Sequence, residues 1–125
     1  MSLKAYFEEK KGLGVLSTAS AEGRVNSAVY SRPHVMEDGT VAFIMTSRLS
    51  YENLVDNPHA AYLFKEEGPG YQGKRLALTK IRESDDPDLI EPLRRRHYDQ
   101  NGEEQMKPLH LVYFRVDGER PLVGG

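Results

Sequence analysis

The feature that most constrains this chain is a series of six short segments that have the residue pattern of β-strands and are separated by turn or breaker residues. These segments span residues 14–19, 25–32, 41–46, 59–65, 74–83 and 109–116. A parallel sheet would need long crossover helices, and only the stretch between the last two segments could supply one. In a chain of 125 residues, the pattern therefore predicts a mainly β fold, an antiparallel barrel with short helices.

The length of the chain fits one domain, which we expect to span residues 1–125. The first 13 residues are predicted to form a short helix that Ser2 caps and that presents Tyr6 and Phe7 on one face. Gly12 and Gly14 are expected to end this helix.

A second covering segment, a helix followed by a linker, is expected over residues 85–108. Asp86 stands before Pro87, which suits the first position of a helix, and the arginines at 94–96 suit its C-terminal end. We interpret these arginines as a solvated helix end rather than as a phosphate-binding patch.

The stretch over residues 46–58 joins a fully apolar strand to a helix of about two turns. Ser50 is predicted to cap this helix, with Leu49 and Leu54 as a hydrophobic staple, and Pro58 ends it. The first backbone N–H groups of a helix lack internal partners and carry the positive end of the dipole, so they favour an anion. Arg48 lies beside this opening, so the stretch is a candidate phosphate site.

Composition excludes several classes of function. The chain has 17 Lys and Arg against 19 Asp and Glu, so no global basic field favours nucleic acid or an anionic membrane. It has no cysteine, which excludes disulfides, thiolate nucleophiles and cysteine-held metals. The start of the chain has no apolar leader and no later apolar run is long enough for a membrane span, so we expect a cytoplasmic protein.

Side-chain chemistry outside the 46–58 stretch gives weaker signals. The histidines show no paired spacing, and we expect no metal site. No serine lies in a nucleophile elbow and no Ser/His/Asp arrangement can be read along the chain, so a hydrolase is not favoured.

Several segments together match a known pattern. They are the first strand Gly-Val-Leu-Ser-Thr-Ala at 14–19, the turn Glu-Gly-Arg at 22–24, the strand Val-Ala-Phe-Ile-Met-Thr at 41–46, and Asn-Leu-Val-Asp-Asn-Pro at 53–58. On these residues the chain resembles the pyridoxamine 5′-phosphate oxidase-related, FMN-binding split-barrel family, over about residues 14–114. The resemblance implies a six-stranded antiparallel split barrel that forms a homodimer, with one FMN in each of two clefts at the subunit interface.

The resemblance also implies where FMN binds. The family holds the FMN phosphate at the end of the third strand and the start of the following helix, which here carry Thr46, Ser47, Arg48 and Ser50. Family members usually have a lysine where this chain has Ser50, and Arg32 is our candidate for the missing charge.

The flavin ring is expected to face the backbone of Val29, Tyr30 and Ser31, on the second strand. Asn53 is expected to extend the hydrogen-bond network at the helix start. Weaker candidates for contacts with the ring or with the partner subunit are Tyr71, Lys74 and Arg75.

The favoured function is an FMN-dependent oxidoreductase in which the flavin carries the redox chemistry and no catalytic side chain is assigned. The substrate and the electron donor stay open. The family's basic C-terminal contacts to a substrate phosphate find no match in residues 115–125, so oxidation of a vitamin B6 compound is not expected.

Two alternatives remain. One is a non-catalytic protein that binds a flavin or haem, with His34, His59 or His110 as the haem ligand. The other is an oligonucleotide-binding barrel in which Tyr30, Tyr62 and Tyr71 stack on bases, which the negative net charge disfavours.

Overall fold

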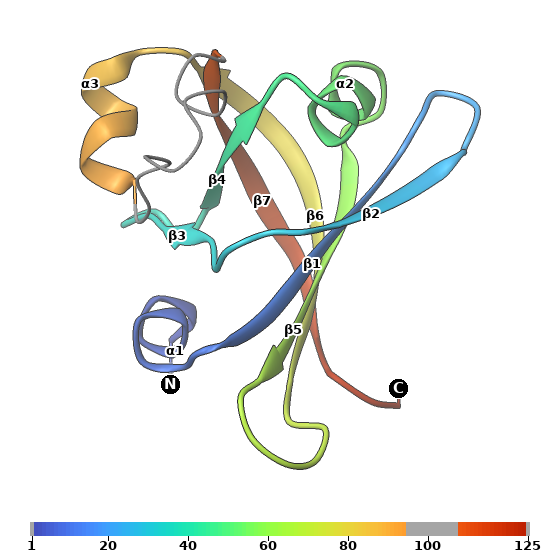
Figure 1. The fold of residues 1–125 in the computed structure, drawn as a ribbon, viewed down its shortest axis with the longest axis vertical. Coiled ribbons are helices and arrows are strands. Elements are labelled where there is room, and N and C mark those ends of the chain that lie inside the picture. The colour runs from blue at the N-terminus through green and yellow to red at the C-terminus, as the bar shows by residue number, and fades with distance from the viewer. Residues whose placement is uncertain (1, 95–107, 125) are drawn as a thin grey trace, which may run out of the picture.

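Seven antiparallel strands form one curved sheet, with short α-helices placed around it (Figure 1). The computed structural model describes residues 2–94 and 108–124. The strands are β1 (Gly12–Ala19), β2 (Val25–Val29), β3 (His34–Val35), β4 (Val41–Thr46), β5 (His59–Glu66), β6 (Gly73–Ser84) and β7 (Leu109–Pro121). The helices are α1 (Leu3–Glu9), α2 (Leu49–Asp56), α3 (Pro87–Ile90) and the 3₁₀ turn η1 (Glu91–Leu93).

The strand order in the sheet is β2-β1-β5-β6-β7-β4-β3. The two edge strands, β2 and β3, follow each other in the chain, so the sheet curls until its edges are joined by residues 30–33 (Figure 1). The predicted antiparallel split barrel is confirmed, with seven strands instead of six. The difference arises at Pro33, which has no N–H for a ladder and separates β2 from the short β3.

The main hydrophobic core lies on one face of the sheet, under α1 and α2. The ring of Phe7 packs edge-on against Tyr62 and Phe64 at centroid distances of 6.1 and 5.4 Å. A second cluster on the opposite face joins Ile90 of α3 to Leu111 of β7 and Ala42 of β4, among other residues. Both faces of β4, and of β7 over residues 110–114, are therefore buried, in keeping with the unbroken apolar run at 41–46.

The first helix follows the prediction at its start and departs from it at its end. Ser2 accepts a hydrogen bond from the backbone N–H of Ala5 at 3.1 Å, as an N-cap does. The helix then ends at Glu9, and the expectation that Gly12 and Gly14 end it is wrong, because both lie in β1. A Cβ on Gly14 would lie 1.9 Å from the hydroxyl of Tyr62, so a close approach between β1 and β5 requires glycine there.

A register shift in β6 between Lys80 and Arg82 changes which residues share a face. Lys80 pairs with Phe114 and Glu83 pairs with Val112, two residues apart on β7. On a regular strand, residues three apart face opposite sides, but the irregularity places Lys80 and Glu83 on the same side. Their ammonium and carboxylate groups meet at 2.7 Å.

The segment after β6 begins as predicted. The side chain of Asp86 accepts from the N–H of Asp88 at 2.9 Å, and Pro87 occupies the first turn. The described part of this segment ends at Arg94, so the expectations for residues 95–107 lie outside the described residues. Among residues 2–94 and 108–124, no helix is both long enough and apolar enough to cross a membrane.

Candidate functional site

The start of α2 differs from the prediction in its capping residue. Arg48 is the N-cap, with an extended backbone and no side-chain capping hydrogen bond, and Ser50 lies inside the first turn with 4% of its surface exposed. The hydrophobic staple is also wrong, because Leu49 is 52% exposed while Leu54 is buried. The helix begins two residues earlier than predicted because Thr46 accepts from the N–H of Arg48 at 2.8 Å, which turns the chain directly after β4.

The end of α2 agrees with the prediction. Asn57 is extended and caps the helix through its N–H to the carbonyl of Asn53, because Pro58 disfavours the helical conformation of the residue before it. The helix has eight residues, about two turns.

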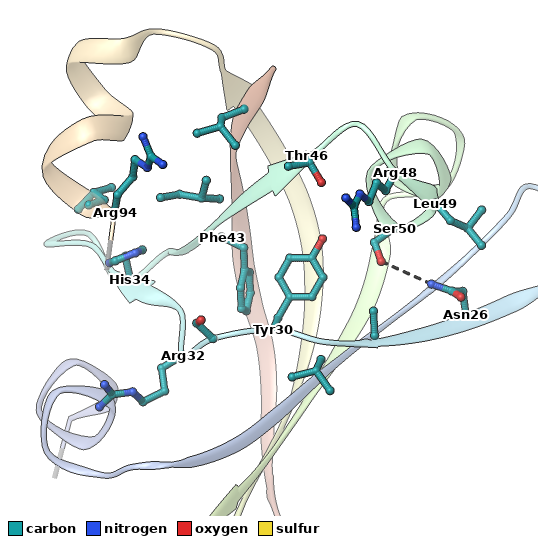
Figure 2. A pocket seen from close by; sticks show the side chains of 16 residues that line it. Asn26, Tyr30, Arg32, His34, Phe43, Thr46, Arg48, Leu49, Ser50 and Arg94 are labelled. Carbon is teal, nitrogen blue, oxygen red and sulfur yellow. Dashed lines mark hydrogen bonds between the residues drawn. The ribbon is translucent and has the colours of Figure 1, made fainter. Parts of the chain in front are cut away.

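A cavity of about 430 Å³ opens between the β2 edge, the end of β4, the start of α2 and the η1 turn. Figure 2 shows the side chains that line it. They are Asn26, Ala28, Val29, Tyr30, Ser31, Arg32, His34, Phe43, Ile44, Thr46, Arg48, Leu49, Ser50, Leu93, Arg94 and Leu109. Seven of the predicted site residues are in this set: Val29, Tyr30, Ser31, Arg32, Thr46, Arg48 and Ser50.

One end of the cavity has the chemistry of an anion site. Thr46, Arg48 and Ser50 surround the start of α2 (Figure 2), where the first-turn N–H groups have no partner within the helix. Asn26 donates from its Nδ2 to the Oγ of Ser50 across a long 3.5 Å contact. A phosphate therefore fits this end, since it finds a cation, hydroxyls and the positive end of a helix dipole together.

Arg32 lines the cavity but does not point toward this end. Its Nη1 donates to the carbonyl oxygens of Phe7 and Lys10, at 2.8 and 2.7 Å. Figure 2 shows the side chain extending toward α1 and away from Arg48. These bonds satisfy carbonyls at the end of α1, so the geometry does not support Arg32 as the replacement for the family's lysine.

The opposite wall is formed by the end of β2 and the residues that follow it. Val29 is 69% exposed, on the edge strand of the sheet. The N–H of Tyr30 donates to Gly14 at 3.0 Å, and the hydroxyl of Tyr62 lies 3.2 Å from the carbonyls of both Tyr30 and Ser31. The backbone of Tyr30 is thus engaged with the fold, and its ring, set edge-on to Phe43 at 6.0 Å, is what reaches the cavity.

Five other predicted residues, Ser47, Asn53, Tyr71, Lys74 and Arg75, are not among the cavity-lining residues. Ser47 has its Oγ 2.7 Å from Nε2 of His110 instead. Asn53 is buried and donates to Thr18 at 3.0 Å, which ties α2 to β1. Tyr71, Lys74 and Arg75 lie at the β5–β6 hairpin, which Figure 1 places at the opposite end of the sheet from α2. Lys74 pairs with Glu119, and Arg75 donates to the carbonyls of Pro121 and Gly124.

Two basic lining residues were not predicted for this site. His34, in β3, was considered only as a haem ligand, and Arg94 was interpreted as a solvated helix end. Arg94 also donates to Glu91 at 2.9 Å. No local pattern marks these positions, because the curl of the sheet and the turn of η1 bring them to the cavity.

Beside the cavity lies a polar cluster that was not predicted as a group, although Ser47 was predicted for the phosphate site and His110 was considered as a haem ligand. The Oγ of Ser47 is 2.7 Å from Nε2 of His110, and Nδ1 of His110 is 2.6 Å from Oδ1 of Asp85. The ring of Tyr51 stacks on the imidazole with a centroid distance of 3.9 Å and an interplanar angle of 10°. The hydroxyl of Tyr51 donates to Oε2 of Glu83 at 2.6 Å.

Two groups of this cluster have shifted pKa values. The hydrogen bond to Glu83, together with burial, raises the pKa of Tyr51 to about 12. Burial acts to raise the pKa of Glu83, but hydrogen bonds from Lys80 and Tyr51 outweigh burial and lower it. Both shifts favour one arrangement, a neutral phenol that donates to an ionised carboxylate.

Glu83, Asp85 and His110 also place one potential metal-ligand atom each within 4.8 Å of one another. Both oxygens of Glu83 are already hydrogen-bonded, to Lys80 at 2.7 Å and to Tyr51 at 2.6 Å. Because the Lys80 ammonium opposes a second cation, we assign no metal ion to this group.

No protein-family model and no curated protein matches the sequence of this chain. Solved structures do match its fold. An FMN-binding protein from Syntrophomonas wolfei subsp. wolfei superposes with a TM-score of 0.77 at 16% identity, covering 99% of this chain and 86% of that chain. A candidate pyridoxamine 5′-phosphate oxidase from Lactobacillus delbrueckii gives a TM-score of 0.69 at 14% identity, covering 96% of this chain and 92% of that chain.

The General Stress Protein 26 from Bacillus anthracis str. Sterne also matches the fold, with a TM-score of 0.69 at 15% identity. Here 95% of this chain and 90% of that chain are covered. At these identities the likenesses establish the fold, while the chemistry of the site has to be argued from the residues themselves.

Proposed function

We propose that this chain, which has the split-barrel fold of the pyridoxamine 5′-phosphate oxidase-related FMN-binding proteins, is an FMN-binding flavoprotein that acts as an oxidoreductase on a small molecule. The observation that carries the proposal is the convergence of Arg48, Thr46 and Ser50 with the start of α2 at one end of a cavity. A volume of about 430 Å³ is within the usual range for a small-molecule site.

Different residues of the cavity bind the phosphate and the ring of the cofactor. Arg48 and the first-turn N–H groups of α2 hold the phosphate, and the hydroxyls of Thr46 and Ser50 add donors beside them. The wall formed by Val29, Tyr30 and Phe43 packs on the ring and excludes water from it. When bound, FMN supplies the redox chemistry, and the protein binds and orients it.

We further propose that the protein is a homodimer whose second copy closes the cavity. Three apolar side chains near the open edge are exposed to solvent: Val25 at 78%, Val29 at 69% and Leu49 at 52%. Exposed apolar groups gathered at an open cavity are typical of an interface. Tyr71, which is 74% exposed on the β5–β6 hairpin, is our candidate for a contact that reaches the flavin of the partner.

The first test is the visible absorption spectrum of the purified protein, followed by titration with FMN. We expect flavin bands near those of free FMN, or saturable uptake of added FMN with quenched flavin fluorescence. Colourless protein that takes up no FMN would overturn the proposal.

The second test compares two variants at the phosphate end. Arg48→Ala removes a charge-assisted hydrogen bond worth about 1.5–3 kcal/mol, which corresponds to a loss of FMN affinity of about ten- to hundredfold. Ser50→Ala removes a neutral partner and should cost less than about tenfold. Riboflavin, which lacks the phosphate, should bind both variants as it binds the wild type. Equal and near-wild-type FMN affinities in both variants would show that the phosphate lies elsewhere.

A second candidate function is non-catalytic haem binding, because His34 is half-buried in the lining of the cavity. An imidazole that lines a cavity is a suitable axial ligand for haem iron. A Soret band on addition of haemin that His34→Ala abolishes, without uptake of FMN, would favour this function over the flavin.

A further inference from the structure

Ser47, His110 and Asp85 form a hydrogen-bonded row whose members are not among the residues that line the cavity. Ser47 bonds to Nε2 of His110 at 2.7 Å, and Asp85 bonds to Nδ1 of the same ring at 2.6 Å. We propose that this row is a serine-nucleophile site, at which Ser47 attacks small carboxylic esters. His110 is the general base of this reaction, and Asp85 is the residue that positions the imidazole.

The position of the proton on the His110 ring favours this assignment. An ionised carboxylate can only accept hydrogen bonds, so the short contact with Asp85 requires the proton of His110 to be on Nδ1. In the neutral imidazole, Nε2 is then an acceptor, and the group it faces is the hydroxyl of Ser47. This tautomer is the one that removes a proton from a serine nucleophile, and the row is recognised by its geometry rather than by the order of its residues in the chain.

The surroundings hold the base and leave the nucleophile accessible. His110 is 8% exposed and is held flat by the stacked ring of Tyr51, whereas Ser47 is exposed. Glu83 places a carboxylate oxygen 3.8 Å from Nδ1 of His110. The imidazolium that forms when Ser47 loses its proton is therefore stabilised by the carboxylates of Asp85 and Glu83. Glu83 is also ion-paired with Lys80.

A place for the developing oxyanion follows Ser47 in the chain. The helix α2 begins at Leu49, and its N-cap Arg48 makes no side-chain capping hydrogen bond to the first-turn N–H groups. These first-turn N–H groups have no partner within the helix, and backbone N–H donors of this kind stabilise the tetrahedral oxyanion of acyl transfer. Thr46 and Arg48 line the flavin cavity and Ser47 does not, so the nucleophile lies beside the cavity. Because the same N–H groups hold the phosphate in the proposed flavin site, the ester reaction takes place in protein that carries no FMN.

The reaction balances with water as its only co-reactant. The Oγ of Ser47 bonds to the acyl carbon while its proton passes to Nε2 of His110, the ester C–O bond breaks, and the alcohol leaves with that proton. Water then attacks the acyl group, the carboxylic acid leaves, and Ser47 regains its proton.

The experiment is labelling of the folded, full-length protein with a fluorophosphonate, located by mass spectrometry, together with hydrolysis of p-nitrophenyl acetate. We expect the phosphonyl group on Ser47 and its loss in Ser47→Ala. In His110→Gln both rates should fall by about a hundredfold or more, because a general base contributes roughly 10²–10⁴-fold. In Asp85→Asn we expect a fall of about tenfold or more, since the tautomer is no longer held.

Steady-state kinetics separate positioning from a structural role. Asp85→Asn should lower kcat for p-nitrophenyl acetate while KM stays near that of the wild type, because the variant still folds and binds the ester but no longer holds the tautomer of His110. The side chain of Asp85 is 71% exposed, so its variant should keep the wild-type melting temperature.

The matched control is Ser27→Ala. Ser27 is also exposed and hydrogen-bonded, but to the hydroxyl of Ser17 at 2.8 Å rather than to a base. This variant should keep the labelling of Ser47 and the esterase rate. The proposal is overturned if Ser47 of the folded protein is not labelled, or if His110→Gln is labelled as fast as the wild type. Labelling of Ser47 in a protein that takes up no FMN would overturn only the flavin proposal.

Discussion

Tyr6 of α1 and Tyr51 of α2 each contact a lysine of β6 and donate to a glutamate, but the two tyrosines have different roles. Tyr6 donates to Glu66 at 2.6 Å with the ammonium of Lys74 4.8 Å from its ring centroid. At the other end of β6, Tyr51 donates to Glu83 at 2.6 Å with the ammonium of Lys80 5.9 Å from its ring centroid.

The difference lies in what the two rings pack against. Tyr6 is 6% exposed and meets Phe7 and Phe64 edge-on at 5.1 and 6.0 Å, so it belongs to the hydrophobic core. Tyr51 is half-buried and stacks on His110, so it belongs to the polar cluster beside the cavity. A tyrosine with a glutamate acceptor and a nearby lysine therefore does not indicate a functional site by itself. The ring against which the tyrosine packs, phenylalanine or histidine, decides its role.

The largest expected effect separates the two rings by stability. Tyr6→Ala removes a core aromatic and should lower the free energy of unfolding by about 3–5 kcal/mol. Tyr51→Ala removes a half-buried ring and one hydrogen bond, and should cost about 1–2 kcal/mol. Urea denaturation of both variants measures the difference. Equal losses would mean that Tyr51 is as much a core residue as Tyr6.

The next effect is the alkaline limit of stability. The hydrogen bond to Glu83 raises the pKa of Tyr51 to about 12, and burial followed by the hydrogen bond to Glu66 raises the pKa of Tyr6 further. Because both folded pKa values lie above the ordinary value of 10.0, the stability they contribute is complete below pH 10 and is lost as the pH rises above it.

Absorbance titration of the phenolate, with unfolding curves from pH 8 to about 11.5, checks this expectation. Tyr51→Phe should remove one late-titrating phenol and reduce the alkaline loss of stability by no more than about 1 kcal/mol, since water screens a partly exposed group. Ionisation of every tyrosine at the pKa of the free phenol would contradict both hydrogen bonds.

The smallest effect is at acid pH and concerns Glu83, the carboxylate of the Tyr51 group. Hydrogen bonds from Lys80 and Tyr51 outweigh burial and lower the pKa of Glu83 below its ordinary value of 4.5. This contribution is therefore complete above pH 4.5 and is lost as the pH falls through the lower, folded value.

Glu83→Gln should lower stability at pH 7 by a few tenths of a kcal/mol and flatten its decline between about pH 5 and pH 3. Unfolding by urea at several pH values measures this slope. An unchanged slope would show that the Lys80–Glu83 pair contributes nothing in solution.

Much of the fold was predictable, because the signals that set it are local. Alternating apolar residues and turn glycines located six strands, Ser2 capped α1, and Pro58 ended α2. The N-cap of α2 was predicted at Ser50 but is Arg48. The N–H of Arg48 bonds to the carbonyl of Thr46, which turns the chain so that the helix begins two residues earlier. A hydroxyl at the right spacing is compatible with a cap and does not establish one.

The candidate site was predictable in part. Arg48 and the helix start could be placed from sequence because they are neighbours in the chain. The direction of Arg32 could not, because the carbonyls that attract it belong to α1, more than twenty residues away.

The sequence by itself determined which segments form strands and helices and fixed some of their ends, such as that of α2 at Pro58, because caps, prolines and the two-residue period act over a few residues. Only the tertiary structure decided which polar groups meet. Met45 pairs with His110 in the β4–β7 register, which brings the following Ser47 to the imidazole, and the turn after β6 delivers Asp85 to its other nitrogen. Those three residues come from segments that span 63 positions of the chain, and hydrogen bonds between strands, rather than any local pattern, bring them together.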